Sequence, residues 1–311
     1  MLIDVGDERG CKAGFSTVDA TEDDSEQSES WVSVPLGIAD VVFQQVLHKP
    51  SPQLERQPLV VGFVDILACG AAIAVGLRLN RLPFRRAFPL APTTAGQLVG
   101  VSITVLSANI LLSEADNVFR ALLPPPRWLS EALNEMFFAQ DKLLSRIFLL
   151  VIVAPVTEEL LFRGIILRGL LSRYRPAVAV ILTALLFAAL HVNPWQGLSA
   201  LCLGIVLAWF YLRTGSVALC VLGHAMSNGL SIVFTLIPWD IPGMTDTADL
   251  TNVTFQPWWL DLSGLVVLVI GLWVFRRATP PIPEPQGPTP PPLPPVIETN
   301  LPRSANPPPL T

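Results

Sequence analysis

Long apolar runs constrain this chain more than any other feature of its sequence. Each run approaches the roughly 20 apolar residues that a helix needs to cross a bilayer. The firmest runs lie near residues 59–79, 95–112, 143–171, 177–192, 196–213, 216–237 and 259–275. Only 14% of the residues are charged, whereas soluble domains carry about 25%. We therefore predict an all-α fold, a polytopic transmembrane helical bundle of about seven to eight spans.

The segments outside these runs suggest how the chain divides into domains. Residues 1–30 are acidic and poor in large apolar side chains, which predicts a disordered leader. Residues 31–47 are more polar than a span and suit an interfacial amphipathic helix. Residues 279–311 are rich in proline and predict an unpacked tail. We expect one membrane domain over residues 31–278, with the motifs in its core at 143–237.

Arginine clusters follow alternate apolar runs and predict the topology. They follow the first, third, fifth and seventh runs, so seven crossings place all of them on one side. The positive-inside rule makes that side cytoplasmic. The polar segments 113–142 and 238–258 are then loops on the other side, the first with room for a lid or a surface helix. We expect an integral protein of the plasma membrane, with its basic loops and C-terminal tail in the cytoplasm.

The third run contains ionisable residues, which would be costly to expose to lipid. Residues 157–164, with the sequence TEELLFRG, place two carboxylates and a guanidinium among apolar side chains. In a helix, Glu159 and Arg163 lie one turn apart in the favourable acid-before-base order. Glu158 points about 100° away from Glu159. Because ionisable groups are costly at membrane depth, this segment is a candidate functional site.

Two later runs each carry a histidine with a partner four residues away. His191 follows Phe187, and His224 precedes Asn228, so each pair lies on one face of its helix. Taken singly, these features also fit structural roles: an ion pair, a cap at a helix end, or hydrogen bonds between helices. Polar stripes in three separate spans favour one shared site over three unrelated ones.

The residue types at these positions suit hydrolysis. A carboxylate and a neutral imidazole in a partly dry cavity can together remove a proton from water. A second imidazole and a side-chain amide can donate hydrogen bonds to the oxygen that becomes negative in a tetrahedral intermediate. The pattern therefore favours hydrolysis of a peptide or amide without a covalent intermediate.

The three motifs in this order resemble those of the CPBP family of intramembrane proteases. The motifs are Glu-Glu-x-x-x-Arg, Phe-x-x-x-His and His-x-x-x-Asn. The family includes the type II CAAX prenyl endopeptidases and the Abi-type bacteriocin-processing and immunity proteins. The resemblance covers roughly residues 90–275. It implies a helical membrane fold and a glutamate-dependent endopeptidase with its cavity inside the bilayer.

The resemblance also implies a role for each matching position. The matching residues are Glu158, Glu159, Arg163, His191, His224 and Asn228. Glu158 and His191 would activate the water. His224 and Asn228 would form the oxyanion site. Glu159 and Arg163 would hold these groups in place.

Cofactor and partner predictions follow from the same residues. The favoured mechanism needs no cofactor. A Zn²⁺ ion held by Glu158, His191 and His224 remains an alternative, because zinc accepts three protein ligands and a water. The expected partners are membrane lipid and a peptide or protein substrate, prenylated in the CAAX case. The net charge of −5 and the lack of a basic cluster of the kind that nucleic acid needs argue against a nucleic-acid partner.

The predicted function is an intramembrane endopeptidase that cuts a peptide bond near the C-terminus of a prenylated or other membrane-bound peptide. One alternative is a catalytically idle immunity or scaffold protein that binds a peptide in the same cavity. Another is a proton-coupled transporter, which also uses buried acids. Retention of every motif residue favours the enzyme.

Overall fold

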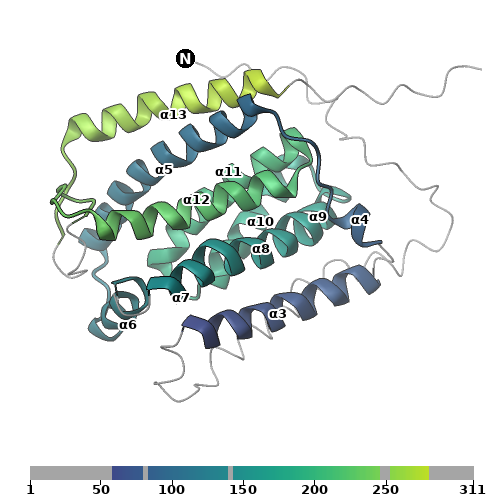
Figure 1. The fold of residues 1–311 in the computed structure, drawn as a ribbon, viewed down its shortest axis with the longest axis horizontal. Coiled ribbons are helices and arrows are strands. Elements are labelled where there is room, and N and C mark those ends of the chain that lie inside the picture. The colour runs from purple at the N-terminus through teal and green to yellow at the C-terminus, as the bar shows by residue number, and fades with distance from the viewer. Residues whose placement is uncertain (1–57, 80–82, 139–142, 246–252, 280–311) are drawn as a thin grey trace, which may run out of the picture. The chain divides into compact units, whose positions relative to one another are not determined.

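Helices make up the regular structure of the computed structural model (Figure 1). The structure describes residues 58–79, 83–138, 143–245 and 253–279, and within these ranges it contains no strand. The elements in chain order are α3 (Pro58–Leu79), α4 (Phe84–Ala87), α5 (Ala95–Leu122), α6 (Arg127–Phe138), α7 (Leu143–Ile147), η2 (Phe148–Val153), α8 (Ala154–Glu159), η3 (Leu160–Leu167), α9 (Arg168–Leu171), α10 (Pro176–Leu190), α11 (Pro194–Thr214), α12 (Val217–Leu236) and α13 (Trp258–Ala278).

The predicted apolar runs are all helical. Five helices in the described part of the chain are long and apolar enough to cross a membrane, namely α3, α5, α11, α12 and α13. α10 is apolar but shorter. The run at 143–171 forms the stretch from α7 to α9, in which η2 and η3 are π-helical. The predicted fold class, an all-helical membrane bundle, is confirmed. The leader at 1–30, the segment at 31–47 and the tail at 279–311 lie outside the described residues, except Thr279, which is buried.

The prediction of a loop from residue 113 is wrong, because α5 continues to Leu122. Polar side chains in this last part of α5 find partners without interrupting the helix. Arg120 donates to Asp116 at 2.8 Å, and Asn117 donates to the carbonyl of Gly243 at 2.7 Å. The surface helix expected in the same segment is α6.

Helix ends that carry arginine gather at one end of the bundle. Arg213, near the end of α11, donates to the carbonyl of Thr279 just beyond α13, at 2.8 Å. Gln97, in the first turn of α5, donates to the Thr279 hydroxyl at 3.5 Å. Arg276 and Arg277 lie in the last turn of α13. This arrangement agrees with the predicted positive end of the bundle, while its cytoplasmic orientation stays a prediction.

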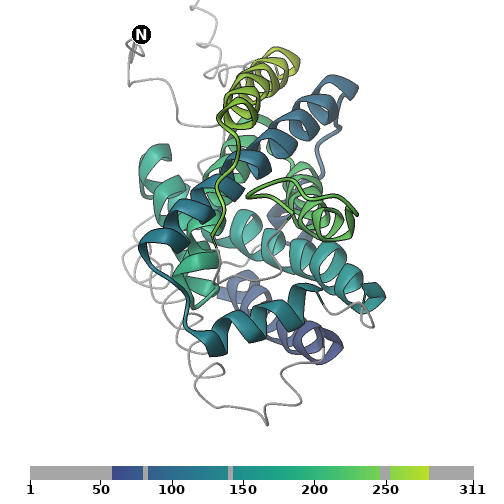
Figure 2. The ribbon, with the colours of Figure 1, turned by 90° about the vertical axis from the view of Figure 1, so that its left-hand side faces the viewer.

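The stretch from α7 to α9 lies between α3 on one side and the α5–α13 pair on the other (Figures 1 and 2). It packs against α3, α10, α11 and α12. Glu159 and residues 161–167 of this stretch are buried by the neighbouring helices, which bring the histidine motifs toward them.

Small residues let α5 and α13 approach closely, as is common between membrane helices. A Cβ atom on Gly100 would lie 2.6 Å from the Cα atom of Phe275. Phe275 is fully buried there, in a core cluster that also includes Val101, Leu207 and Cys220.

Gly100→Ala is expected to lower the free energy of unfolding by about 1–3 kcal/mol, because backbone atoms must move to admit the methyl group. Gly70→Ala is the matched control, since nothing lies within 4 Å of a Cβ atom at Gly70. Thermal unfolding in detergent should show a loss of stability only for Gly100→Ala. Equal stability of the two variants would contradict the close α5–α13 contact.

Candidate active site

A buried ion pair lies at the centre of the motif-bearing segment. Both Glu159 and Arg163 have 0% of their side chains exposed, and Arg163 Nη1 donates to Glu159 Oε1 at 2.9 Å. Arg163 Nη2 donates to the carbonyl of Gly204 on α11 at 3.0 Å. The guanidinium also lies over the ring of Phe187, 5.2 Å from its centroid. The predicted pair therefore exists, and it connects this segment to α10 and α11.

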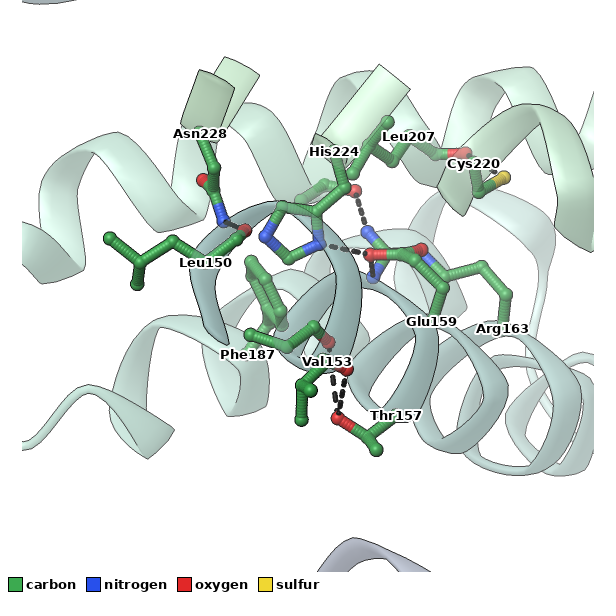
Figure 3. Close-up of polar contacts among 12 residues, drawn as sticks. Leu150, Val153, Thr157, Glu159, Arg163, Phe187, Leu207, Cys220, His224 and Asn228 are labelled. Atoms are coloured by element: carbon green, nitrogen blue, oxygen red, sulfur yellow. Dashed lines mark hydrogen bonds and ion pairs between the residues drawn. The ribbon is translucent and has the colours of Figure 1, made fainter. Parts of the chain in front are cut away.

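His224 joins the same carboxylate from α12 (Figure 3). Its Nδ1 lies 2.9 Å from Glu159 Oε1, which already accepts from Arg163. The imidazole is buried, with 3% of the residue exposed. An ionised carboxylate only accepts hydrogen bonds, so Nδ1 carries a proton. The other ring nitrogen, Nε2, points to the side of the site on which Asn228 lies.

His191 is placed by the end of α10. The helix ends at Leu190, so its last carbonyls lack the usual backbone donors. His191 Nδ1 lies 3.0 Å from one of them, the carbonyl of Phe187. Because a carbonyl only accepts, Nδ1 is again the protonated nitrogen, and in a neutral ring Nε2 keeps its lone pair.

The residues after His191 form a tight and strained turn. Val192 has a φ of 57°, in a region that β-branched residues rarely occupy. Asn193 donates to the carbonyl of His191 at 3.0 Å and accepts from the backbone of Gln196 at 2.9 Å as the N-cap of α11. Local strain of this kind is often found where a functional group must be held in place.

Phe187 lies between the charged and the imidazole groups. It is buried, with 1% of the residue exposed. Its ring centroid lies 5.4 Å from that of His191 and 5.6 Å from that of His224, in edge-to-face arrangements. One aromatic ring therefore brings the second and third motifs together around the first.

Glu158 and Glu159 each have a buried Oε2 atom without a hydrogen-bond partner. They differ in that Arg163 and His224 both contact the other oxygen of Glu159. The preceding residue, Thr157, contacts Asp65 of α3 through its hydroxyl, 2.6 Å from Asp65 Oδ2. The Cys69 thiol lies 3.4 Å from the other oxygen of Asp65. A buried carboxylate oxygen without a protein partner is an acceptor available to water or substrate.

Asn228 binds a backbone carbonyl in the helical turn that precedes the first motif. Its Nδ2 donates to the carbonyl of Leu150 in η2 at 2.7 Å (Figure 3). The structure thus gives positions to all six predicted residues, and it links Glu159, Arg163 and His224 by direct contacts. The catalytic roles assigned to these residues stay predictions.

Asp65 was not indicated by the sequence patterns. It is a single carboxylate in the apolar run that forms α3, with no motif around it. The available signal was its cost at membrane depth, which by itself marks a candidate functional residue.

The proposed zinc ligands do not gather into a metal site. Among the described residues there is no group of three or more His, Cys, Asp or Glu side chains arranged to hold an ion. Nδ1 of His224 is also occupied by Glu159. As they are arranged here, Glu158, His191 and His224 do not fit a zinc ion.

The fold and the buried cluster define the class: an integral membrane protein with carboxylate and imidazole groups enclosed by its helices. Residues 140–230 match the family model described as type II CAAX prenyl endopeptidase Rce1-like. The resemblance to the CPBP family is thereby confirmed over this segment, which contains all three motifs. The match supports a protease of the CAAX endopeptidase kind.

One curated relative covers more of the chain. The uncharacterized protein YyaK of Bacillus subtilis (strain 168) is 26% identical over 223 residues, which cover 67% of this chain and 72% of the relative. No solved structure matches the chain significantly.

Arg163→Met should lower the free energy of unfolding by about 3–5 kcal/mol, because it leaves the Glu159 carboxylate buried without its cation. The double variant Glu159→Gln/Arg163→Met should be more stable than Arg163→Met, since no charge of the pair then remains. Unfolding of the purified variants in detergent measures both values. A double variant less stable than Arg163→Met would contradict the pairing.

Val192→Gly should raise the free energy of unfolding by about 1 kcal/mol, because glycine accepts a positive φ without strain. The opposite exchange, Gly215→Ala, should lower it by a similar amount: Gly215 has a φ of 64° at the end of α11, and nothing lies near a Cβ atom there. Thermal unfolding of the two variants and of the unaltered protein measures both changes. A destabilised Val192→Gly would show that the side chain of Val192 matters more than its backbone strain.

Proposed function

We propose that this protein is an intramembrane endopeptidase that hydrolyses a peptide bond in a membrane-bound peptide, with a prenylated CAAX-type C-terminus as the favoured substrate. The observation that carries the proposal is the buried, unpartnered oxygen of Glu158 beside the Glu159–Arg163–His224 cluster. The Rce1-like match supports the substrate class. In this proposal, the basic end of the bundle faces the cytoplasm and the protein resides in the plasma membrane.

Water activation is assigned to Glu158 and His191. The Glu158 carboxylate takes a proton from water, and the hydroxide formed attacks the carbonyl carbon of the substrate. His191 holds the same water, because its Nδ1–H is engaged by the Phe187 carbonyl and its Nε2 can accept a hydrogen bond. When the C–N bond breaks, Glu158 returns its proton to the leaving amine.

The oxyanion site is assigned to His224 and Asn228. As an imidazolium, His224 donates Nε2–H to the substrate oxygen, while the Glu159 carboxylate faces and stabilises the cation. The Asn228 amide has two N–H groups, and one of them donates a hydrogen bond to the Leu150 carbonyl. The second can donate to the same oxygen. Arg163 fixes Glu159 and acts on the reaction only through it.

Glu158→Gln should abolish cleavage of a prenylated C-terminal peptide, with a fall in kcat of at least about 10²-fold, because the amide cannot accept the proton from water. The matched control is Glu131→Gln on α6, whose side chain is exposed. Reconstituted protein and a mass-spectrometric assay measure both variants.

Three results would contradict this assignment. Cleavage by Glu158→Gln at the normal rate would remove Glu158 from the mechanism. Peptide binding by the unaltered protein without cleavage of any library member would indicate an idle binding protein. Proton-coupled flux in liposomes would indicate a transporter.

A further inference from the structure

The Leu150 carbonyl that holds Asn228 is free for a reason found in the sequence. In an α-helix this carbonyl would accept from the backbone N–H of residue 154. Here the N–H of Ala154 donates instead to the carbonyl of Leu149, five residues earlier, as in a π-helix. The next backbone donor along the same wide turn would be residue 155, which is a proline and has no N–H. Leu150 is thus left without a backbone donor.

An unpaired carbonyl is unfavourable inside a membrane protein, where water is scarce. Asn228 satisfies it through Nδ2 at 2.7 Å. The contact also fixes which way the amide faces, because the amide oxygen cannot accept from a carbonyl. The NH₂ group is therefore held on the side of η2, with one N–H bound to Leu150 and the other free to donate.

We propose that Pro155 is a positioning residue for Asn228 and acts through the Leu150 carbonyl. By withholding a backbone N–H, the proline keeps this carbonyl available, and the carbonyl orients the amide that donates to the substrate oxygen. Pro155 is buried and lies at the start of α8, and the proposal gives it no contact with the substrate. The proposal rests on the proposed function, because it assumes that Asn228 stabilises the oxyanion.

Pro155→Ala tests the proposal, because it restores an N–H that can pair with Leu150 in the same five-residue pattern. Asn228 then loses its partner, and kcat should fall about tenfold while KM stays within about twofold, as expected when an oriented donor is lost. Thermal stability should not fall, since residue 155 lies within the continuous helical stretch from α7 to α9 and there gains a hydrogen bond and loses a proline. Pro176→Ala is the control: Pro176 is in the first turn of α10, where the N–H is unpaired in any case, and kcat should not change.

A double-mutant cycle with Asn228→Ala separates positioning from a general effect on structure. Pro155→Ala should lower kcat in the unaltered background and have no effect when Asn228 is alanine. Equal losses in both backgrounds, or an unchanged kcat in Pro155→Ala, would overturn the proposal. Pro155→Gly supplies the same N–H and should behave alike. If neither variant folds, the proposal is also overturned, because it gives Pro155 no share in stability.

Failure of the proposed function would look different. In that case the unaltered protein would cleave no peptide, or would cleave it as fast as Glu158→Gln. If the unaltered protein cleaves, Glu158→Gln does not, and Pro155→Ala matches the unaltered protein, only the role of Pro155 is refuted.

Discussion

The structure depends on an ion pair that has no access to water. Glu159 and Arg163 face the interior of a helical membrane bundle, where an isolated ion would be very costly. The pair is tolerated because other helices supply partners: a carbonyl of α11 for Arg163 and an imidazole of α12 for Glu159. One ion pair therefore fixes how three parts of the bundle pack around the candidate site.

Backbone carbonyls hold the site as much as side chains do. Arg163 donates to Gly204, His191 to Phe187, and Asn228 to Leu150. Two of these carbonyls are available because the helix is irregular, at the end of α10 and in the wide turn of η2. A regular helix pairs most of its own carbonyls, so an irregular position adds a carbonyl that a polar side chain can bind without competition from the backbone. The irregular positions thus orient the groups that would carry the chemistry.

The apolar runs of the sequence predicted where the helices lie, but they placed the end of α5 near residue 112 instead of Leu122. Apolar runs had the length of a membrane span, which is a constraint that lipid imposes directly. The end of α5 was missed, because Asp116 and Asn117 look like loop residues but are satisfied by Arg120 and Gly243. Asp65 carried no motif, and its relation to Thr157 became visible only when α3 packed beside α8.

The sequence by itself determined the local pairs. Four-residue spacing places Arg163 against Glu159, and His191, at the end of α10, beside Phe187, because residues four apart lie about one helical turn apart. Only the tertiary structure decided the contacts between helices: His224 with Glu159, 65 residues apart, and Asn228 with Leu150, 78 residues apart. Helical periodicity fixes neighbours within a helix, but which helices meet, and at what depth, follows from how the whole bundle packs.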